Sequence, residues 1–293
     1  MEGLKELKQA GEIASSSLLL GKKLIKKGAS TAKIQQEIED YIKSRGAKPA
    51  FPAQLSLNSV AAHQCDDEDV PLQEDLVKLD VGVHINGYIA DNAVTIDLSG
   101  NYKDLVNSSK KALKEALKLM TPGTSLREIG KTIQQTITDD GFSPVRNLTG
   151  HALSRYVVHD KPSVPNIDHE SNTVLKENMV LAVEPFASSG SGIVAEGGHN
   201  TLYTLTAKKP VRSIITRKVL QKITTYNGLP FTSRWLYEEF GKPKVLFALR
   251  ELKQKGLLIE HPPLIDTQKG MVSQAEHTVI VKDKPIITTK NES

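Results

Sequence analysis

The stretch LVKLDVGVHINGYIADNAVTID, residues 76–97, determines how the rest of the chain is organised. Asn86-Gly87 at its centre is a strong signal for a two-residue type I′ turn, because both turn positions need a positive φ. The flanking segments are therefore predicted to pair as a β-hairpin in which Ile85 lies opposite Tyr88. Alternate side chains of the first strand (Val77, Leu79, Val81, Val83 and Ile85) form its apolar face.

Two aspartates lie close together on one face of this predicted hairpin. The same register puts Gly82 opposite Asp91, and Asp80 lies two residues before Gly82 on the same face. Gly82 leaves that patch open, so two carboxylates beside a hole could hold a pair of metal ions about 3.5–4 Å apart. The alternative is an ordinary hairpin with two solvated acids. The rest of the chain has to decide between these interpretations.

The composition is that of a globular protein. At 293 residues the chain is long enough for one large domain or two ordinary ones, with 39% hydrophobic and 25% charged residues. No apolar run approaches the ~20 residues of a membrane span, and the N-terminus has no apolar signal core. Cys65 is the only cysteine, which excludes an intrachain disulfide. We therefore expect a cytoplasmic protein that does not contact membranes.

Two predicted helices repeat one another at a constant distance in the sequence. Each of these helices follows a serine that can cap its N-terminus and ends at a glycine. The first runs from Ser30 to Gly46 and the second from Ser125 to Gly141. Each is preceded by another predicted helix, at 4–27 and at 103–120. The identical residues, 95 positions apart, are Gly28/Gly123, Ser30/Ser125, Ile34/Ile129, Ile38/Ile133, Ile42/Ile137, Gly46/Gly141 and Pro49/Pro144. This duplication predicts two halves with their sheets side by side, helices outside, and a site between them.

The second half supplies further groups that can bind metal. Glu184 lies in MVLAVEPFAS and Glu276 in QAEHTVIV, two stretches that are predicted as buried strands. A carboxylate within an apolar strand is costly unless it is paired or bound to a metal. His151 follows the fourth helix and, taken alone, would more often be structural. Together with Asp80 and Asp91, however, these residues predict one metal site.

These five residues, in their order and spacing, resemble the ligand pattern of the methionine aminopeptidases. The matching segments are KLDVGVHINGYIADNAV with Asp80 and Asp91, LTGHAL with His151, AVEPF with Glu184, and QAEHTVIV with Glu276. The resemblance covers nearly the whole chain. The insertion between the last two motifs is similar to that of the type II subfamily, in its short, archaeal-style form. The implied fold is the α/β (α+β) pita-bread fold, with pseudo-twofold antiparallel sheets and outer helices, in agreement with the repeat.

The resemblance also implies how a catalytic centre would work. Two divalent ions would be held, Mn, Fe or Co in preference to Zn, because four carboxylates and one imidazole form a hard, oxygen-rich site. Asp91 and Glu276 would bridge both ions, Asp80 would complete one, and His151 with Glu184 the other. The ions would activate a shared water and polarise the scissile carbonyl, and Glu184 would handle the proton of that water.

Two further histidines and an apolar pocket complete the implied site. His63 and His159 match two histidines that do not bind metal but hydrogen-bond the substrate's carbonyl or amide, so we expect them to be catalytic and to bind substrate. For His63 the alternative is a plain surface histidine. Phe51 and Val158 match positions of the methionine pocket. His261 is expected to line the same pocket, where relatives often carry Tyr.

The segment 208–261 is predicted to be a helical, winged-helix-like subdomain inserted into a catalytic domain formed by 1–207 and 262–293. It contains twelve Lys or Arg against four Glu, a net charge of +8, whereas the whole chain has +4. One interpretation is a lid that shapes the cleft and is incidentally basic. The other is a surface that docks on ribosomal RNA, where phosphate contacts would make binding sensitive to salt. Its helices are predicted at 214–226, 233–240 and 244–255.

We therefore expect a monomeric dimetal aminopeptidase that removes the initiator methionine from the N-termini of nascent polypeptides. It would prefer a small second residue and act by metal-activated attack of water on the first peptide bond. Two alternatives stay open. An X-Pro aminopeptidase or prolidase-like hydrolase would use the same ligands, but such relatives usually carry a separate N-terminal domain. A non-catalytic pita-bread scaffold that binds RNA or protein partners would be expected to have lost at least one of the five ligands.

Overall fold

A computed structural model describes residues 1–65, 67–207 and 209–290. Lys208, the first residue of the predicted insertion, and residues 291–293 of the predicted catalytic domain lie outside the described residues. The helices are α1 (Leu4–Leu24), α2 (Thr31–Ser44), α3 (Lys103–Lys118), α4 (Leu126–Asp139), α5 (Ile214–Thr224), α6 (Arg234–Phe240) and α7 (Lys242–Gln254). Within the described ranges, no helix combines the length and apolar composition that crossing a membrane requires.

The strands form one large sheet and three small ones. The large sheet has nine strands, in the order β1-β4-β5-β17-β9-β7-β8, with β2 paired to β4 and β18 to β17. The strands are β1 (Lys48–Pro49), β2 (Gln54–Leu57), β3 (Val60–Ala62), β4 (Leu76–Ile85), β5 (Tyr88–Asp97), β6 (Ser143–Pro144), β7 (Thr149–Ser154), β8 (Val157–Pro165), β9 (Val180–Val183), β10 (Phe186–Ser188), β11 (Val194–Glu196), β12 (Leu202–Leu205), β13 (Phe231–Thr232), β14 (Leu258–Glu260), β15 (Leu264–Asp266), β16 (Val272–Gln274), β17 (Glu276–Ile280) and β18 (Ile286–Ile287).

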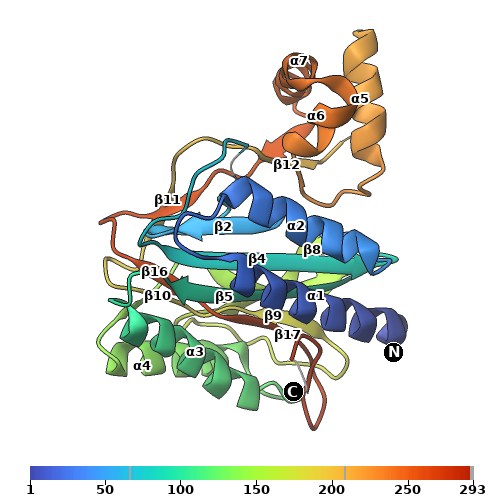
Figure 1. Ribbon diagram of the computed structural model, residues 1–293. Coiled ribbons are helices and arrows are strands. Elements are labelled where there is room, and N and C mark those ends of the chain that lie inside the picture. The colour runs from blue at the N-terminus through green and yellow to red at the C-terminus, as the bar shows by residue number, and fades with distance from the viewer. Residues whose placement is uncertain (66, 208, 291–293) are drawn as a thin grey trace.

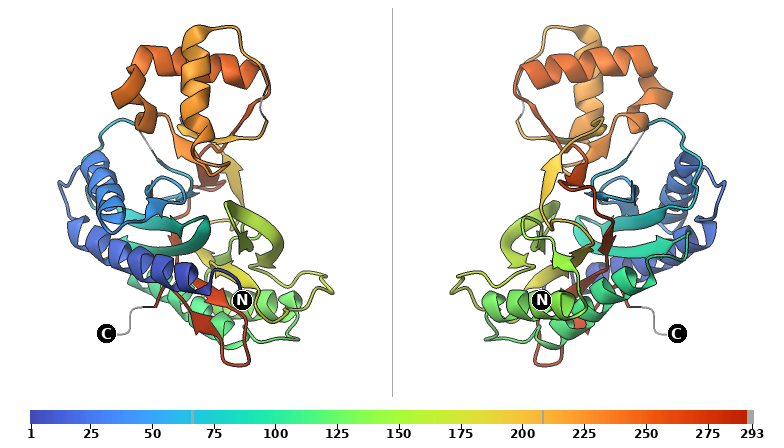
Figure 2. Two further views of the ribbon diagram at one scale, coloured as in Figure 1. Left: turned by 90° about the vertical axis from the view of Figure 1, so that its right-hand side faces the viewer. Right: turned by 90° about the vertical axis from the view of Figure 1, so that its left-hand side faces the viewer.

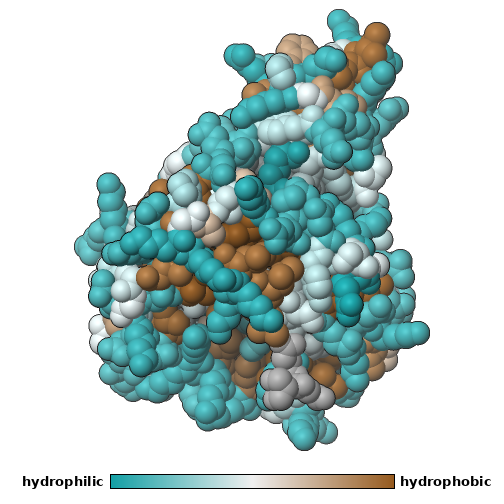
Figure 3. Space-filling view, in the orientation of Figure 1, coloured by the Kyte–Doolittle hydropathy of each residue, from teal (hydrophilic) through white to brown (hydrophobic). Residues whose placement is uncertain are grey.

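The four helices α1–α4 cover one face of the curled antiparallel sheet and leave the other face to the site (Figures 1 and 2). The outer surface of these helices is mostly hydrophilic, and apolar side chains show through between α1 and α3 (Figure 3). Strands β17 and β9 lie at the centre of the sheet, between the hairpin β4–β5 of the first half and the hairpin β7–β8 of the second. The predicted pita-bread class, two halves with outer helices, is therefore confirmed.

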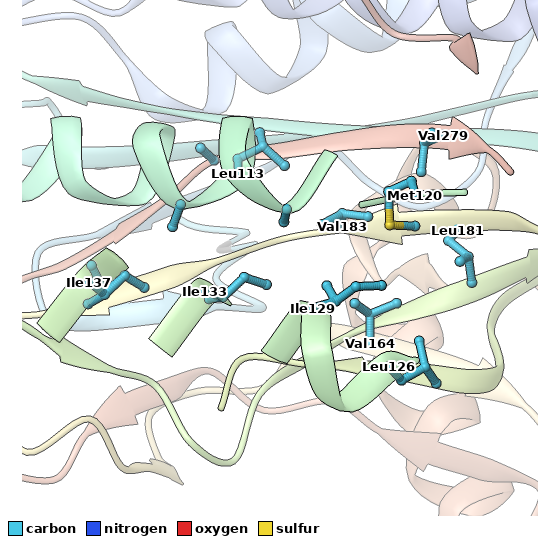
Figure 4. Close-up of a cluster of buried hydrophobic side chains, with 14 of the residues drawn as sticks. Leu113, Met120, Leu126, Ile129, Ile133, Ile137, Val164, Leu181, Val183 and Val279 are labelled. Atoms are coloured by element: carbon cyan, nitrogen blue, oxygen red, sulfur yellow. The ribbon is translucent and has the colours of Figure 1, made fainter. Parts of the chain in front are cut away.

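The sequence repeat is a structural repeat. α2 and α4 begin 95 residues apart and end 95 residues apart, at Thr31 and Leu126 and at Ser44 and Asp139. The preceding serines cap both helices, because each side chain accepts a backbone N–H at 3.1 Å. The repeated isoleucines enter separate cores, one under α2 (Ile34, Ile38, Ile42) and one under α4 (Ile129, Ile133, Ile137; Figure 4).

The central hairpin has the predicted register but not the predicted hole. Ile85 pairs with Tyr88 and Gly82 with Asp91, around a turn in which Asn86 has φ 52° and Gly87 φ 88°. The space at Gly82, however, is filled by the ring of Phe51: a Cβ added at Gly82 would lie 2.2 Å from Phe51 Cε1. The prediction of an open patch is therefore wrong. Glycine is required there because an aromatic ring packs against the strand.

The predicted strand around Glu184 is two strands. β9 ends at Val183 in the large sheet, and β10 begins at Phe186 in a small sheet with β6 and β16. Pro185 has no N–H to contribute to a ladder, so the chain changes sheets at this point. The interpretation of 179–188 as one strand is wrong. Glu184 lies at the break, where its side chain is free to turn towards the cavity.

The helices α5, α6 and α7 stand above the large sheet, together with the small sheet β13-β12-β14 (Figure 1). They have a hydrophobic cluster of their own, which includes Val219, Leu236, Val245 and Leu249. The order of three helices and a strand follows the expectation for residues 214–260. The division of the chain into 1–207 with 262–293 and 208–261 stays a prediction.

Candidate active site and metal centre

A cavity of about 260 Å³ lies on the open face of the large sheet. There the two halves meet the helical segment, which is formed by α5, α6 and α7. All five residues predicted as metal ligands line it. So do all five predicted substrate-binding residues. The lining includes Asp80, Asp91, His151, Glu184, Glu276, Phe51, His63, Val158, His159 and His261. Residues that are far apart in the sequence thus converge on one small space, as the repeat predicted.

Three buried side chains form the centre of the cluster. One ligand atom each from Asp91, His151 and Glu276 lies within 4.8 Å of the other two. His151 Nε2 is 3.9 Å from Asp91 Oδ2 and 3.5 Å from Glu184 Oε1. Asp80 lies diagonally from Asp91 on the β4–β5 ladder. These positions allow the five side chains to act on the same ions.

Strand pairing explains why the acids meet. β17 pairs with β5 so that Glu276 lies opposite Ala93, two residues from Asp91. The Asp91 backbone is fixed at the same place, because its N–H donates to Thr278 Oγ1 at 2.7 Å and its carbonyl accepts from that hydroxyl at 2.9 Å. Thr278 was missed by sequence reasoning, since a threonine in a strand carries no special signal.

A similar pairing in the second half positions the imidazole. His151 of β7 lies opposite Ala182 of β9, two residues from Glu184. Glu184 itself accepts a hydrogen bond from Gln274 Nε2 at 3.2 Å. The first half and the central strand β17 therefore supply carboxylates, and the second half supplies an imidazole with its neighbouring carboxylate.

The buried oxygens of this cluster fit divalent metal ions. Asp80 Oδ1, Asp91 Oδ1 and both carboxylate oxygens of Glu276 are buried and have no hydrogen-bond partner among the described atoms. A buried polar atom without a partner is costly, and a buried charge more so. Four acids and an imidazole with oxygens left free for coordination are the donor set of a hard-cation site.

The electrostatics lead to the same conclusion. Burial raises the pKa of Asp80 to about 7. Burial, together with the neighbouring carboxylates, raises the pKa of Asp91, Glu184 and Glu276 well above their ordinary values. Like charges this close cannot all ionise without a compensating positive charge. Divalent ions would supply that charge.

The histidines of the cavity are held neutral. Burial, with nearby His261 and His159, lowers the pKa of His63 to about 3. Burial lowers the pKa of His159 to about 4, with a smaller contribution from His261. The His159 ring lies 4.6 Å from the His151 ring, edge to face, and the His63 ring 5.8 Å from the His261 ring. A neutral imidazole offers one donor and one acceptor, which suits contact with a peptide group.

One wall of the cavity is apolar. Phe51 and Val158 belong to a common hydrophobic cluster with Leu229. Leu202 and Pro230 also line the cavity, and neither was predicted. They come from the chain at the base of the helical segment, where the sequence offered only ordinary apolar residues without a motif.

Known proteins match the chain over nearly its whole length. Residues 5–283 match metallopeptidase family M24. A methionine aminopeptidase of Archaeoglobus fulgidus is 42% identical over 291 residues, which cover 98% of each chain. That of Pyrococcus horikoshii is also 42% identical over 291 residues, covering 97% of this chain and 99% of its own.

Solved structures share the fold. That of a methionine aminopeptidase from Thermotoga maritima has a TM-score of 0.71 at 22% identity, covering 98% of this chain and 96% of its own. That of a thermophilic Arx1 has a TM-score of 0.87 at 16% identity, covering 100% and 92%. At these identities the likeness shows the fold alone, whereas the sequence matches show the family. The chain belongs to the methionine aminopeptidases of metallopeptidase family M24.

Proposed function

We propose that the cavity is the active site at which this metal-dependent aminopeptidase removes the initiator methionine of nascent proteins. The observation that carries the proposal is the buried cluster of Asp91, His151 and Glu276, with ligand atoms within 4.8 Å of one another. Its oxygens without partners face the same cavity as the apolar wall of Phe51 and Val158. A metal centre beside a small apolar pocket suits hydrolysis next to an unbranched apolar side chain.

The five side chains Asp80, Asp91, His151, Glu184 and Glu276 would hold two divalent ions. Mn, Fe or Co suits this donor set better than Zn, which favours sites with more nitrogen and sulfur ligands. When bound, the ions supply an activated water at neutral pH and polarisation of the scissile carbonyl.

The residues of the chain itself then position the reactants. Glu184, which is ionised when the ions are bound, takes the proton of the attacking water and passes it to the leaving amine. His159 and His63, both neutral, hydrogen-bond the substrate's carbonyl or amide. The cavity of about 260 Å³ has room for a methionine side chain beside the proposed metal centre, and we propose that the second residue of the substrate is small.

Turnover of two peptides tests this function. Protein freed of metal by a chelator is reconstituted with Mn, Fe, Co or Zn, and hydrolysis of a Met-Gly-type peptide is compared with that of an X-Pro peptide. We expect metal-dependent release of methionine from the first and little reaction of the second. Preference for the X-Pro peptide would favour a prolidase-like hydrolase, and failure to cleave either peptide with any metal would favour a non-catalytic scaffold.

We propose further that the protein acts as a monomer in the cytoplasm and that its basic segment docks on the ribosome. Arg217 and Lys218 are exposed on α5, and Lys222, one turn later, pairs with Glu239 at 2.9 Å. A basic helix of this kind binds RNA phosphates with a strong dependence on salt. The alternative is that the segment serves only as a wall of the peptide cleft.

Co-sedimentation with ribosomes distinguishes these roles. In one variant Arg217, Lys218 and Lys222 are changed to Glu; in a matched control, Lys5, Lys8 and Lys23 of α1 are changed to Glu. We expect the first variant to lose salt-sensitive binding and the control to keep it. Equal binding by both variants, or no binding by wild type, would leave the segment as a cleft wall.

A further inference from the structure

A buried carboxylate outside the cavity connects two of its walls. Glu39 lies on α2, is fully buried, and accepts four hydrogen bonds, two on each oxygen. Two donors are Ala53 and Trp235, and Arg234 gives the other two. Building on the proposed function, we propose that Glu39 is a positioning residue that sets the distance between the two sides of the methionine pocket.

The first side is the segment around Ala53. Its N–H donates to Glu39 Oε1 at 3.2 Å, and its carbonyl accepts from Gln35 Nε2 at 3.0 Å. Gln35 and Glu39 lie one turn apart on α2, so one binds the carbonyl of Ala53 and the other binds its N–H. The residues around it, Phe51 and Gln54, line the cavity.

The hydrogen bonds from α2 also influence the position of His63, through Gln54. The side-chain oxygen of Gln54 accepts the backbone N–H of His63 at 2.8 Å. His63 has a φ of +67°, a conformation that costs a non-glycine residue free energy and persists only where its surroundings impose it. The position of the His63 ring in the cavity therefore depends on Gln54, which is held by α2 through its neighbour Ala53 and by pairing with Asp80 of β4.

The second side is the base of the helical segment. The Arg234 guanidinium binds Glu39 in a fork, with Nη1 3.0 Å from Oε2 and Nη2 on Oε1. Trp235 Nε1 donates to Oε2 at 2.7 Å. These two residues open α6, shortly after Pro230, which lines the cavity. One carboxylate thus fixes the segment of Phe51 and His63 against the segment of Pro230.

Stability alone does not account for this ion pair. A buried salt bridge contributes little net stability compared with apolar side chains of the same volume, because desolvating both charges offsets their attraction. Helices α5–α7 already have a hydrophobic cluster of their own. The ion pair instead fixes the orientation of the two side chains, because a bidentate Arg–carboxylate pair allows only one geometry. We therefore expect its loss to widen the pocket.

Substitution of Glu39→Gln tests this role, because it keeps the shape and removes the charge. We expect KM for a Met-Gly-type peptide to rise about tenfold, with metal content unchanged and a smaller change in kcat, since the pocket and not the centre is displaced. Trp235 is the only tryptophan of the chain, so its emission wavelength should shift when the carboxylate beside its Nε1 loses its charge. Glu37→Gln, exposed on the same helix, is the matched control and should match wild type in both measurements.

A second pair of variants separates position from stability. Arg234→Met leaves Glu39 buried and unpaired, so it should lower the melting temperature more than Glu39→Gln does. The double variant Glu39→Gln/Arg234→Met should recover most of that melting temperature and still show the raised KM. A folded double variant with the KM of wild type would overturn the proposal. So would unchanged Trp235 emission in Glu39→Gln, a measurement that stands even if wild type proved inactive and the proposed function failed.

Discussion

The two hairpins of the large sheet each follow one of the two helix pairs, β4–β5 after α1 and α2 and β7–β8 after α3 and α4, but they differ in chemistry. β4–β5 runs in regular register for ten residue pairs and carries Asp80 and Asp91. β7–β8 has register shifts beside His151 and carries imidazoles, His151 and His159. Neither hairpin alone offers a complete set of ligands. The difference teaches that duplication supplied the scaffold and that the candidate site exists only where unlike halves face each other.

The helices behind the hairpins differ in the same way. Glu39 and Gln35 of α2 correspond, 95 residues on, to Gln134 and Gly130 of α4. In the second half, Gln134 accepts the N–H of Asp168 at 2.7 Å, and Gly130 admits the Ile167 carbonyl, which would lie 2.1 Å from an added Cβ. α4 thus holds the chain that follows its own hairpin, whereas α2 holds the pocket and the helical segment.

The largest effect on turnover should come from a substitution in the hairpin β4–β5, which carries Asp80 and Asp91. Asp91→Asn removes a proposed metal ligand, so we expect turnover to fall by more than about a thousandfold, because most of the rate acceleration would depend on the ions. The fold should survive, since the amide keeps the shape of the carboxylate. Steady-state kinetics and circular dichroism check this, with the exposed Asp104→Asn as control. Turnover near that of wild type at matched metal loading would contradict a metal centre on this hairpin.

Substitution of His159, in the hairpin β7–β8 that also carries His151, should lower turnover less and should leave metal binding intact. His159→Ala removes a group that we propose to contact substrate, so we expect kcat to fall about 100-fold while bound metal stays nearly unchanged. Kinetics with elemental analysis of the same samples provide the measurement, and the exposed His169→Ala is the control. Loss of both ions in His159→Ala would indicate that His159 is a metal ligand and would contradict its proposed role in binding substrate.

The smallest effect concerns pH and the protein without metal. The pKa of Asp80 is raised to about 7 and those of Asp91, Glu184 and Glu276 are raised well above their ordinary values, so near neutral pH these acids hold protons when folded and release them when unfolded. Folded-state stability is therefore lost as pH rises towards the folded pKa values. The cavity histidines have lowered pKa values and titrate near pH 6.5 when unfolded, so they offset part of this loss up to about pH 7.5 and are neutral in both states above it.

We expect the melting temperature of the metal-free protein to fall by several degrees between pH 6.5 and pH 8, and added metal to raise it more at pH 8. Differential scanning calorimetry at the two pH values measures both quantities. A metal-free melting temperature that rises over this interval would show that the acids are already ionised in the folded protein, and would contradict the burial argument.

Local signals in the sequence predicted much of the fold. Asn86-Gly87 determines the hairpin register through its own backbone preference, and the isoleucine spacing of α2 and α4 reports which face is buried. The convergence of five ligand residues followed from the repeat and the resemblance. Their assignment as ligands stays a prediction that metal analysis must test.

What could not be predicted depends on contacts between distant segments. Phe51 fills the space at Gly82 from a segment that gave no sign of packing there. Pro185 did carry a usable signal, since proline interrupts a central strand, and it marks the break beside Glu184. Glu39 looks like an ordinary charged residue on a helix, and only the approach of Arg234 makes it buried and paired.

The central claim is that the two unlike hairpins, with β17 and with Glu184 after β9, hold two divalent ions in one centre. Stepwise addition of Mn to metal-free protein, with bound metal and turnover measured at each step, tests it most directly. We predict two ions per chain for wild type, fewer for Asp80→Asn in the first hairpin and for His151→Ala in the second, and turnover that follows occupancy. Two ions retained by both variants, or full turnover by protein without metal, would contradict the account.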